Sequence, residues 1–275
     1  MEVKVIASGS TGNCTYISAG NHKILIDCGI SKKSIDNELE KMNVSTSQID
    51  TLLITHEHDD HIRSLGAILR KVNLTCYMSE GTYKVITSGK NETLKKIVEL
   101  KFQQGNLLLL KRISNSINYP DIYIDDLEVN VLPAFHDAVE TIGFKINYQS
   151  KSIVYLTDTG YVHQSLLPIM ADCDCYILEF NHDPHILMAS DRTYALKMRI
   201  LSEHGHLSNE DAAVVLAHSV GPKTKVVFYA HISQECNLTQ IVEMTKDKVF
   251  NSIGIEYKEI DFVFTSPIAT KVYKI

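Results

Sequence analysis

Three histidines and an aspartate lie within six residues of one another in the first quarter of the chain: His56, His58, Asp60 and His61. Neutral imidazole nitrogens and carboxylate oxygens are ligands suited to zinc, manganese or iron. Four such groups in so short a segment exceed the usual needs of one catalytic ion. The pattern His-x-His-x-Asp-His therefore predicts half of a two-metal site rather than a solvated polar loop.

The residues on either side of this motif predict how it is positioned. The short apolar run Thr51–Thr55 precedes it and is typical of an interior strand, whereas residues 62–69 have apolar side chains at helical spacing. The motif is thus expected in the turn between a strand and a helix. His56 and His58 can then face one ion, while Asp60 and His61 open the helix and point toward a second one.

Three further candidate ligands each follow an apolar run. They are His136 after Leu127–Leu132, Asp158 after Ser152–Leu156, and His231 after Val226–Ala230. Ligands at the carboxyl ends of several strands collect along one edge of a sheet, where open α/β folds place their active sites. The resulting assignment is His56, His58 and His136 for one ion, Asp60, His61 and His231 for the other, and Asp158 as the bridge.

Four other motifs extend the pattern over most of the chain, from about Ile6 to Asn237. They are Ser8-Gly9-Ser10-Thr11-Gly12-Asn13-Cys14, Leu178-Glu179-Phe180-Asn181-His182-Asp183, Gly205-His206-Leu207-Ser208-Asn209-Glu210-Asp211-Ala212 and Ala230-His231-Ile232-Ser233. Together with the metal motif, they make the chain resemble a metallo-β-lactamase-fold hydrolase of the YycJ/WalJ/VicX branch. The resemblance implies an exonuclease that degrades DNA from a 5′ end.

The order of predicted elements is strand-rich, then helical, then strand-rich again. Strands are expected at Val3–Ile6, Thr15–Ser18, Lys23–Asp27, Thr51–Thr55, Thr75–Met78, Leu127–Leu132, Thr141–Tyr148, Ser152–Leu156, Tyr176–Glu179 and Val226–Ala230. Helices are expected at Lys32–Met42, Ile62–Lys71, Thr193–Ser202 and Asn209–Ser219, with Ser208 as N-cap of the last and Asp211 three residues on. With the resemblance, this order predicts the α/β class, as an αββα sandwich of two mixed sheets with outer helices, in one domain of residues 1–275. Residues 90–126 are expected to be an irregular insertion.

Composition favours an intracellular enzyme. The first residues lack the basic start and apolar core of a signal peptide, and no apolar run approaches a membrane span, so we expect a cytoplasmic protein. The six cysteines form no disulfide-rich pattern and are expected to be packed thiols. The net charge of −6 opposes broad attraction to nucleic acid, so any contact with DNA must be local.

The expected chemistry uses two adjacent divalent ions, with zinc first and manganese or iron as alternatives. Such a pair generates a bridging hydroxide near neutral pH, which attacks a phosphodiester, and Asp60 is a candidate for orienting it. His206 is favoured as proton donor to the leaving oxygen, and His182 is the alternative. Candidate substrate contacts are Ser10, Asn13, Arg192, Lys197, Arg199 and Ser208.

Other functions share the metal motif. A thioester or lactone hydrolase of the glyoxalase II type carries the same His-x-His-x-Asp-His pattern and fits the acidic composition. A noncatalytic nucleic-acid-binding regulator is a further alternative, although such relatives often lose ligands and all seven positions are filled here. We favour a nuclease acting on DNA or another phosphodiester, while the oligomeric state stays open.

Overall fold

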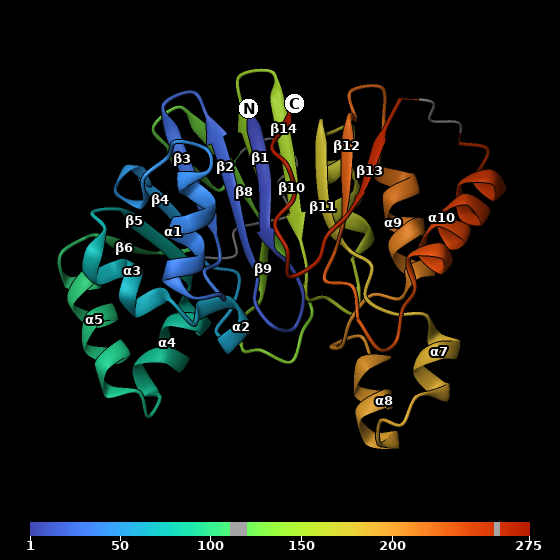
Figure 1. The fold of residues 1–275 in the computed structure, drawn as a ribbon, viewed down its shortest axis with the longest axis horizontal. Helices are drawn as coiled ribbons and strands as arrows, with labels where there is room; N and C mark the ends of the chain where they lie inside the picture. The colour runs from blue at the N-terminus through green and yellow to red at the C-terminus, as the bar shows by residue number, and fades with distance from the viewer. Residues whose placement is uncertain (111–119, 256–258) are drawn as a thin grey trace. The chain divides into compact units, whose positions relative to one another are not determined.

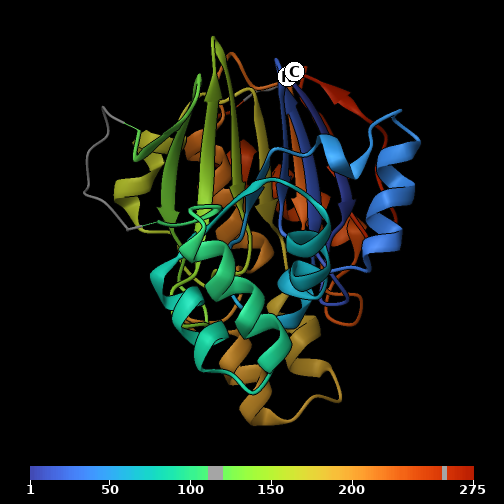
Figure 2. The same ribbon diagram turned by 90° about the vertical axis from the view of Figure 1, so that its left-hand side faces the viewer.

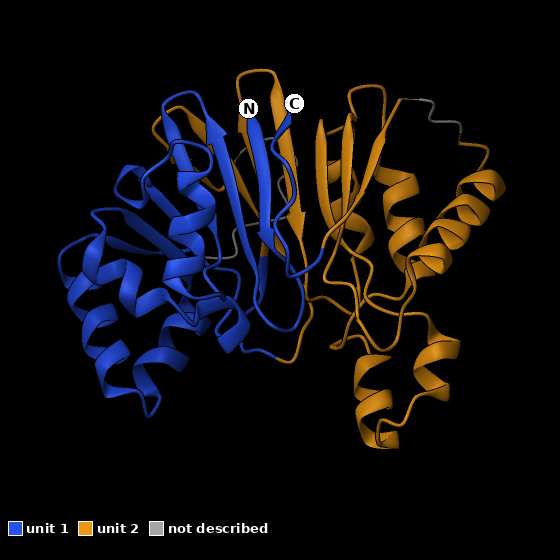
Figure 3. Cartoon of the chain, viewed as in Figure 1, with its two compact units in different colours: residues 1–112, 138–142, 266–274 blue, residues 113–137, 143–265, 275 orange. Residues whose placement is uncertain are grey.

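The structure is a computed structural model that describes residues 1–110, 120–255 and 259–275. The chain divides into two compact units, drawn in different colours in Figure 3. Unit 1 comprises residues 1–112, 138–142 and 266–274, and unit 2 comprises residues 113–137, 143–265 and 275. Among the described residues, no helix has the length and apolar character needed to span a membrane. The prediction of a single domain stays a prediction.

Unit 1 is built on a seven-stranded mixed sheet in the order β14-β1-β2-β3-β4-β5-β6 (Figure 1). Its strands are β1 (Glu2–Ala7), β2 (Cys14–Ala19), β3 (His22–Ile26), β4 (Thr51–Leu53), β5 (Thr75–Ser79), β6 (Leu107–Leu110) and β14 (Tyr273–Lys274). Strands β14 to β3 pair antiparallel, and β3 to β6 pair parallel. Most residues of these parallel strands are apolar and buried.

The helices of unit 1 connect these parallel strands. They are α1 (Lys32–Glu40), α2 (Asp59–Ile62), α3 (Leu65–Lys71), α4 (Glu80–Ser88) and α5 (Glu92–Gln103). Helix α5 packs on both α3 and α4, and Figure 2 shows α4 and α5 side by side in teal and green. Their apolar faces join one buried cluster with the sheet, which includes Leu25, Leu52 and Leu65.

Unit 2 carries a second seven-stranded mixed sheet, in the order β13-β12-β11-β10-β9-β8-β7. Its strands are β7 (Ile122–Ile124), β8 (Leu127–Pro133), β9 (Ile142–Tyr148), β10 (Lys151–Leu156), β11 (Cys175–Glu179), β12 (Val226–Ala230) and β13 (Asp261–Phe264). Strands β10 to β13 pair parallel, so their carboxyl ends meet at one edge. Three acidic or imidazole side chains lie at that edge. Glu179 is the last residue of β11, Asp158 comes two residues after β10, and His231 comes directly after β12.

The helices of unit 2 are α6 (Leu167–Met170), α7 (Pro184–Ala189), α8 (Tyr194–Ile200), α9 (Asn209–Ser219) and α10 (Thr239–Ile253). Helices α9 and α10 pack against each other and against the main buried cluster of the unit. Helices α7 and α8 share a small separate cluster of Leu187, Ile200 and Cys236. In Figure 1, these two helices lie next to each other beyond the carboxyl ends of the strands.

Every strand predicted from the sequence is present, and the four predicted helices are present with small changes of length. The helix predicted at Ile62–Lys71 is interrupted, because α2 ends at Ile62 and α3 begins at Leu65. Ser208 is the N-cap of α9, as predicted, and its side chain accepts a hydrogen bond from Asp211 N. All six cysteines are buried and free, which confirms the prediction of packed thiols.

The prediction of an irregular insertion at residues 90–126 is wrong for most of its length. Helix α5 and strands β6 and β7 occupy described parts of it, while residues 111–119 lie outside the described residues. The many lysines and glutamates of α5 obscure its apolar stripe of Leu94, Ile97 and Val98. The four leucines of β6 form a continuous apolar run that pairs parallel with β5. Because apolar and polar residues do not alternate in it, the run lacks the sequence pattern of a half-exposed strand.

Candidate metal centre and its supporting hydrogen bonds

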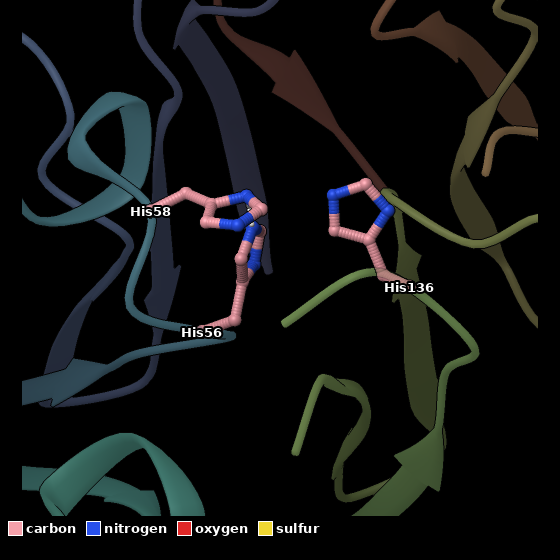
Figure 4. A group of neighbouring side chains, drawn as sticks. All are labelled: His56, His58 and His136. Atoms are coloured by element: carbon pink, nitrogen blue, oxygen red, sulfur yellow. Dashed lines mark hydrogen bonds between the residues drawn. The ribbon is translucent and has the colours of Figure 1, made fainter. Parts of the chain in front are cut away.

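Unit 1 holds four predicted ligands, His56 and His58 in the turn after β4 and Asp60 and His61 in the first turn of α2. Figure 4 shows the imidazoles of His56 and His58 next to each other, with His56 Nε2 3.1 Å from His58 Nδ1. The rings of His56 and His61 lie 4.0 Å apart between centroids, and His61 Nε2 is 3.6 Å from Asp60 Oδ2. The turn and the start of α2 together gather all four groups, with His58 as the N-cap residue of the helix.

A buried carboxylate at the end of β3 holds this turn in place. Asp27 is fully buried, and its Oδ1 accepts a hydrogen bond from Thr55 N at 2.9 Å. Its Oδ2 accepts from Thr55 Oγ1 at 2.9 Å and lies 2.8 Å from His61 Nδ1. Because a carboxylate only accepts, His61 carries its proton on Nδ1 and keeps a lone pair on Nε2. Burial raises the pKa of Asp27, and the His61 imidazole and the Thr55 donors partly offset that rise.

Glu57, inside the same motif, has a structural task. Its Oε1 accepts a hydrogen bond from Val139 N at 2.9 Å, and its Oε2 accepts from Thr82 Oγ1 at 3.1 Å. The carboxylate thus fastens the 138–142 segment and α4 to the motif, all within unit 1. This contact explains why an acidic residue stands between two predicted ligands without being one of the set.

Unit 2 contributes a compact group of four titratable side chains: Asp158, Glu179, His206 and His231. One ligand atom of each lies within 4.8 Å of those of the others. Asp158, Glu179 and His231 are buried, whereas the His206 side chain is 19% exposed. Two of the four, Asp158 and His231, were predicted as ligands, and His206 was predicted as proton donor. Glu179 is the member that sequence reasoning did not assign.

Glu179 organises this group through both carboxylate oxygens. Its Oε1 lies 2.7 Å from His206 Nδ1 and 2.9 Å from His231 Nδ1, and its Oε2 accepts from Thr159 N and Leu207 N. Both imidazoles therefore donate from Nδ1 and present Nε2 elsewhere. Burial alone would raise the pKa of Glu179, but the His206 and His231 imidazoles outweigh it and lower the pKa to about 2.

His136, the third residue drawn in Figure 4, belongs to unit 2 and follows β8. Its Nδ1 lies 3.0 Å from the carbonyl oxygen of Gly205 and donates a hydrogen bond to it. Its Nε2 faces the carboxylates of Asp137 and Asp158, at 3.0 Å and 4.0 Å. A Cβ on Gly205 would come within 2.3 Å of the carbonyl oxygens of Arg199 and Ile200. Only glycine allows this approach, which accounts for the first residue of the Gly-His-Leu-Ser-Asn motif.

Backbone conformation marks the same positions. Asp27, Asp158 and His231 all have positive φ, at 60°, 55° and 52°. Such values are uncommon for residues other than glycine and cost free energy that the surrounding contacts must supply. Each of the three stands directly after, or two residues after, the last residue of a strand. The left-handed turn ends the strand and directs the side chain out of the sheet.

These donor sets fit divalent transition-metal ions. Imidazoles dominate, carboxylates complete the set, and three of the imidazoles have Nδ1 bound to a carboxylate or a carbonyl so that Nε2 is oriented for a ligand bond. An Asp or Glu that accepts from the far nitrogen of a ligand histidine also strengthens that ligand. The histidine and aspartate clusters are therefore suited to metal binding, whereas the metal assignment made from sequence stays a prediction.

The second proton-donor candidate, His182, lies in a different environment. It is buried at 1% exposure, and among the described residues neither ring nitrogen has a hydrogen-bond partner. Burial, as the largest cause, lowers its pKa to about 4. Its backbone carbonyl accepts from Asn209 N, which joins the Asn-His-Asp motif to the start of α9.

The predicted substrate contacts of α8 and its preceding loop have intrachain partners. Arg192 binds Glu235, and Arg199 pairs with Asp137. Lys197 Nζ donates to the carbonyl oxygens of Met188 and Ser190, at the end of α7. Each retains some exposure, so the prediction stays open.

The remaining three candidates differ in exposure. Ser10 is exposed in the loop between β1 and β2. Ser208 is occupied as the cap of α9. Asn13 is buried at 1% exposure, with its amide against His61 rather than at the surface.

Asp27 and Glu179 are the functional residues that sequence reasoning missed. Both stand at the end of an apolar strand, where an acidic residue is an ordinary turn former. The signal available in the sequence was position, since both occupy the same place relative to a strand as the predicted ligands. Glu179 also lies inside a motif of the branch, but no spacing rule relates it to His206 or His231.

We predict that Asp27→Asn destabilises the metal-free protein by about 1–3 kcal/mol, because an amide cannot accept from Thr55 and His61 together and leaves a buried donor unsatisfied. Urea unfolding of the metal-free variant measures this loss. Glu40→Gln, an exposed change in the same unit, is the control and should stay within about 0.5 kcal/mol of the wild type. Equal stability of the two variants would contradict the role of Asp27.

We also predict that Glu179 sets part of the acid sensitivity of the metal-free protein. Its folded pKa of about 2 lies below the ordinary value of 4.5, so its stabilisation is present above pH 4.5 and is lost as the pH falls toward 2. In unfolding experiments across this window, Glu179→Gln should show a shallower loss of stability than the wild type. The exposed Glu203→Gln should keep the wild-type slope. Parallel curves for all three proteins would refute the prediction.

Comparison with known proteins agrees with this architecture. Residues 22–232 match the Beta-lactamase superfamily domain. Among curated proteins, the chain is 34% identical to the exodeoxyribonuclease WalJ of Streptococcus pneumoniae (strain D39 / NCTC 7466), covering 96% of this chain and 93% of that protein. It is 30% identical to the exodeoxyribonuclease YycJ of Bacillus anthracis, covering 92% and 90%.

Solved structures share the fold. The metallo-β-lactamase fold protein YhfI from Bacillus subtilis aligns with a TM-score of 0.67 at 16% identity, covering 99% of this chain and 98% of that chain. The short form of human tRNase Z aligns with a TM-score of 0.63 at 16% identity, covering 98% and 99%. The two mixed seven-stranded sheets with flanking helices confirm the predicted fold class. The chain therefore belongs to the metallo-β-lactamase superfamily and is a metallo-hydrolase.

Proposed function

We propose that this metallo-hydrolase is a DNA exonuclease that cleaves phosphodiester bonds from a 5′ end. The observation that carries the proposal is the partly exposed His206 imidazole, bound to the buried Glu179 carboxylate within the Asp158 and His231 cluster. A proton donor beside metal-suited ligands is what hydrolysis of an ester with a poor leaving group requires. The exodeoxyribonucleases that align over nearly the whole chain support DNA as substrate, and the motif resemblance supports the 5′ direction.

We propose two divalent ions per chain, zinc first and manganese or iron as alternatives. The first would be held by His56, His58 and His136, the second by Asp60, His61 and His231, with Asp158 as bridge. The seven-residue pattern in the sequence and membership of the superfamily support this assignment. Two bound ions would supply a nucleophilic hydroxide near neutral pH and offset the negative charge that develops on the phosphate.

The proposed role of His206 is to hold a proton on Nε2 and deliver it to the departing sugar oxygen. Its Nδ1 donates to Glu179, so Nε2 is the nitrogen left to meet a substrate. The hydrogen bond to Glu179 also fixes the orientation of the imidazole ring before transfer. Glu179 itself is buried and accepts four hydrogen bonds, so it acts by orienting His206 and His231.

His206 suits this role better than His182 because of exposure. His182 is 1% exposed, and burial favours its neutral form by lowering its pKa to about 4. A group that is neutral and enclosed at pH 7 does not deliver protons efficiently to a bound substrate. We therefore assign His182 to the support of the loop that carries the branch motif.

Substrate contacts are proposed for Ser10 and for the cations of the α8 region, Arg192, Lys197 and Arg199. With a net charge of −6, the chain needs local positive groups to receive a phosphate backbone. Arg192 and Arg199 currently pair with carboxylates, so a phosphate would replace Glu235 or Asp137 as their partner. Such an exchange couples DNA binding to a rearrangement of α8 side chains.

A substrate panel tests the proposed function. Metal-loaded protein is incubated with DNA that carries a label at its 5′ end or at its 3′ end. An enzyme that starts at the 5′ terminus should release the 5′ label first and the 3′ label last. Asp158→Ala should lose both this activity and bound metal in elemental analysis. Matched reactions with RNA, a thioester and a lactone complete the panel. Turnover confined to the thioester and the lactone would reject the nuclease assignment.

A second experiment isolates the proton donor. We predict that His206→Ala keeps its metal yet slows DNA cleavage by about 10²–10⁴-fold, the range typical of losing a positioned acid. A nitrophenyl phosphodiester, whose leaving group needs little protonation, should be cleaved at nearly the wild-type rate. The buried His182→Ala variant serves as the comparison and should affect both substrates alike. Equal slowing of both substrates by His206→Ala would exclude the acid role.

A further inference from the structure

Asn13 occupies an unusual place for an uncharged polar residue. It is the last residue of the Ser8–Asn13 loop between β1 and β2 and is buried at 1% exposure. Its Oδ1 accepts a hydrogen bond from Gly9 N at 2.9 Å, and its Nδ2 donates to Gly9 O at 3.1 Å. These two bonds to one residue fix which end of the amide is oxygen and which is nitrogen.

The second hydrogen on Nδ2 faces two predicted metal ligands. Nδ2 lies 3.0 Å from His61 Nε2 and 3.4 Å from Asp60 Oδ2, and all these residues belong to unit 1. Because His61 donates from Nδ1 to Asp27, its Nε2 can only accept, and an amide NH₂ can only donate. The geometry is therefore a hydrogen bond from Asn13 to the nitrogen that a metal ion would bind.

The backbone around Asn13 is packed so closely that the amide cannot withdraw easily. Asn13 N donates to Asp60 O at 2.8 Å, and Gly29 N donates to Asn13 O at 2.8 Å. A Cβ on Gly29 would lie 1.6 Å from Asp60 O, and one on Gly12 would lie 2.6 Å from Gly29 O. The two glycines thus allow three backbone segments to touch, and they place Asn13 against His61.

We propose that Asn13 is a positioning residue of the metal centre that exchanges acceptors when the site is loaded. In the metal-free protein, it holds His61 Nε2; when an ion takes that nitrogen, the same hydrogen passes to the Asp60 carboxylate. The inference rests on the proposed metal centre and adds to it a residue outside the ligand set. Only a small movement is needed, since Asp60 Oδ2 already lies 3.4 Å from Nδ2.

The exchange favours the loaded form. The bond to a neutral imidazole in the metal-free state is replaced by a bond to a carboxylate, and hydrogen bonds to charged groups are about twice as strong as neutral ones. Asn13 also orients Asp60 by holding one of its oxygens. Removal of the amide should therefore weaken metal binding, while a carboxylate at this position should act in the opposite direction by adding negative charge beside the ion.

Zinc binding measured by competition with a chromophoric chelator at pH 8 tests the proposal without any nuclease assay. Asn13→Ala should bind zinc about 10–100-fold more weakly, the usual cost of losing a residue that supports a ligand. Asn13→Asp retains an acceptor for Gly9 N and should bind zinc at least as tightly as the wild type. Its metal-free form should melt at a lower temperature and gain more from zinc than the wild type does. Thr11→Ala, an exposed change in the same loop, is the matched control.

A purely structural role for Asn13 has a different signature. Both Asn13 variants would then lose stability, with the aspartate less affected because it keeps one bond to Gly9, and both would bind zinc as the wild type does. That result would overturn the inference and leave the proposed function intact. A wild type that binds none of zinc, manganese and iron would instead refute the metal-dependent function, and the role of Asn13 would fail with it.

Discussion

A buried carboxylate that fixes imidazoles is the interaction on which the candidate ligand cluster of each unit depends. In unit 1, Asp27 accepts from Thr55 and His61; in unit 2, Glu179 accepts from His206, His231 and two backbone N–H groups. An ionised carboxylate is costly to bury unless donors surround it, so the donors cannot be moved independently. Each carboxylate stands at the carboxyl end of a strand, which gives its position the rigidity of the sheet. Orientation of the imidazoles thus follows from the strands and not from the loops.

The sequence predicted much of this arrangement because ligands and strands leave local patterns. The His-x-His-x-Asp-His turn and the strand ends before His136, Asp158 and His231 are visible as short motifs and apolar runs. The partners Asp27 and Glu179 were not predictable in the same way, since these contacts join residues 27 to 52 positions apart. Helix α10 was missed for a related reason: its buried residues are Val242, Lys246, Val249 and Phe250, so a lysine interrupts an apolar face of only three side chains. Sequence patterns specify elements, whereas pairings between distant elements arise only on folding.

The branch motif Gly-His-Leu-Ser-Asn gains a physical explanation from the same contacts. The carbonyl oxygen of Gly205 accepts a hydrogen bond from His136. The His206 imidazole and the Leu207 N–H both donate to Glu179, and Ser208 is the N-cap of α9. Asn209 and Asn237 exchange reciprocal side-chain hydrogen bonds, and Asn237 also donates to the carbonyl oxygens of Phe180 and Asn181. Each of these five consecutive residues therefore makes a defined contact, and two of them, His206 and Leu207, share Glu179 as partner. The segment therefore links the candidate site residues His136 and Glu179 to the start of α9.

The buried thiols allow the opening of each unit to be detected separately by chemical modification. Cys14, Cys28 and Cys76 lie in unit 1, and Cys173, Cys175 and Cys236 lie in unit 2, all enclosed. Burial raises the pKa of the first five, which keeps them as unreactive thiols in the folded chain. An alkylating reagent can therefore modify them only during opening of the surrounding structure, and peptide mapping of the adducts assigns each event to one unit. The natural chain thus permits the opening kinetics of each sheet to be followed separately, without engineered labels.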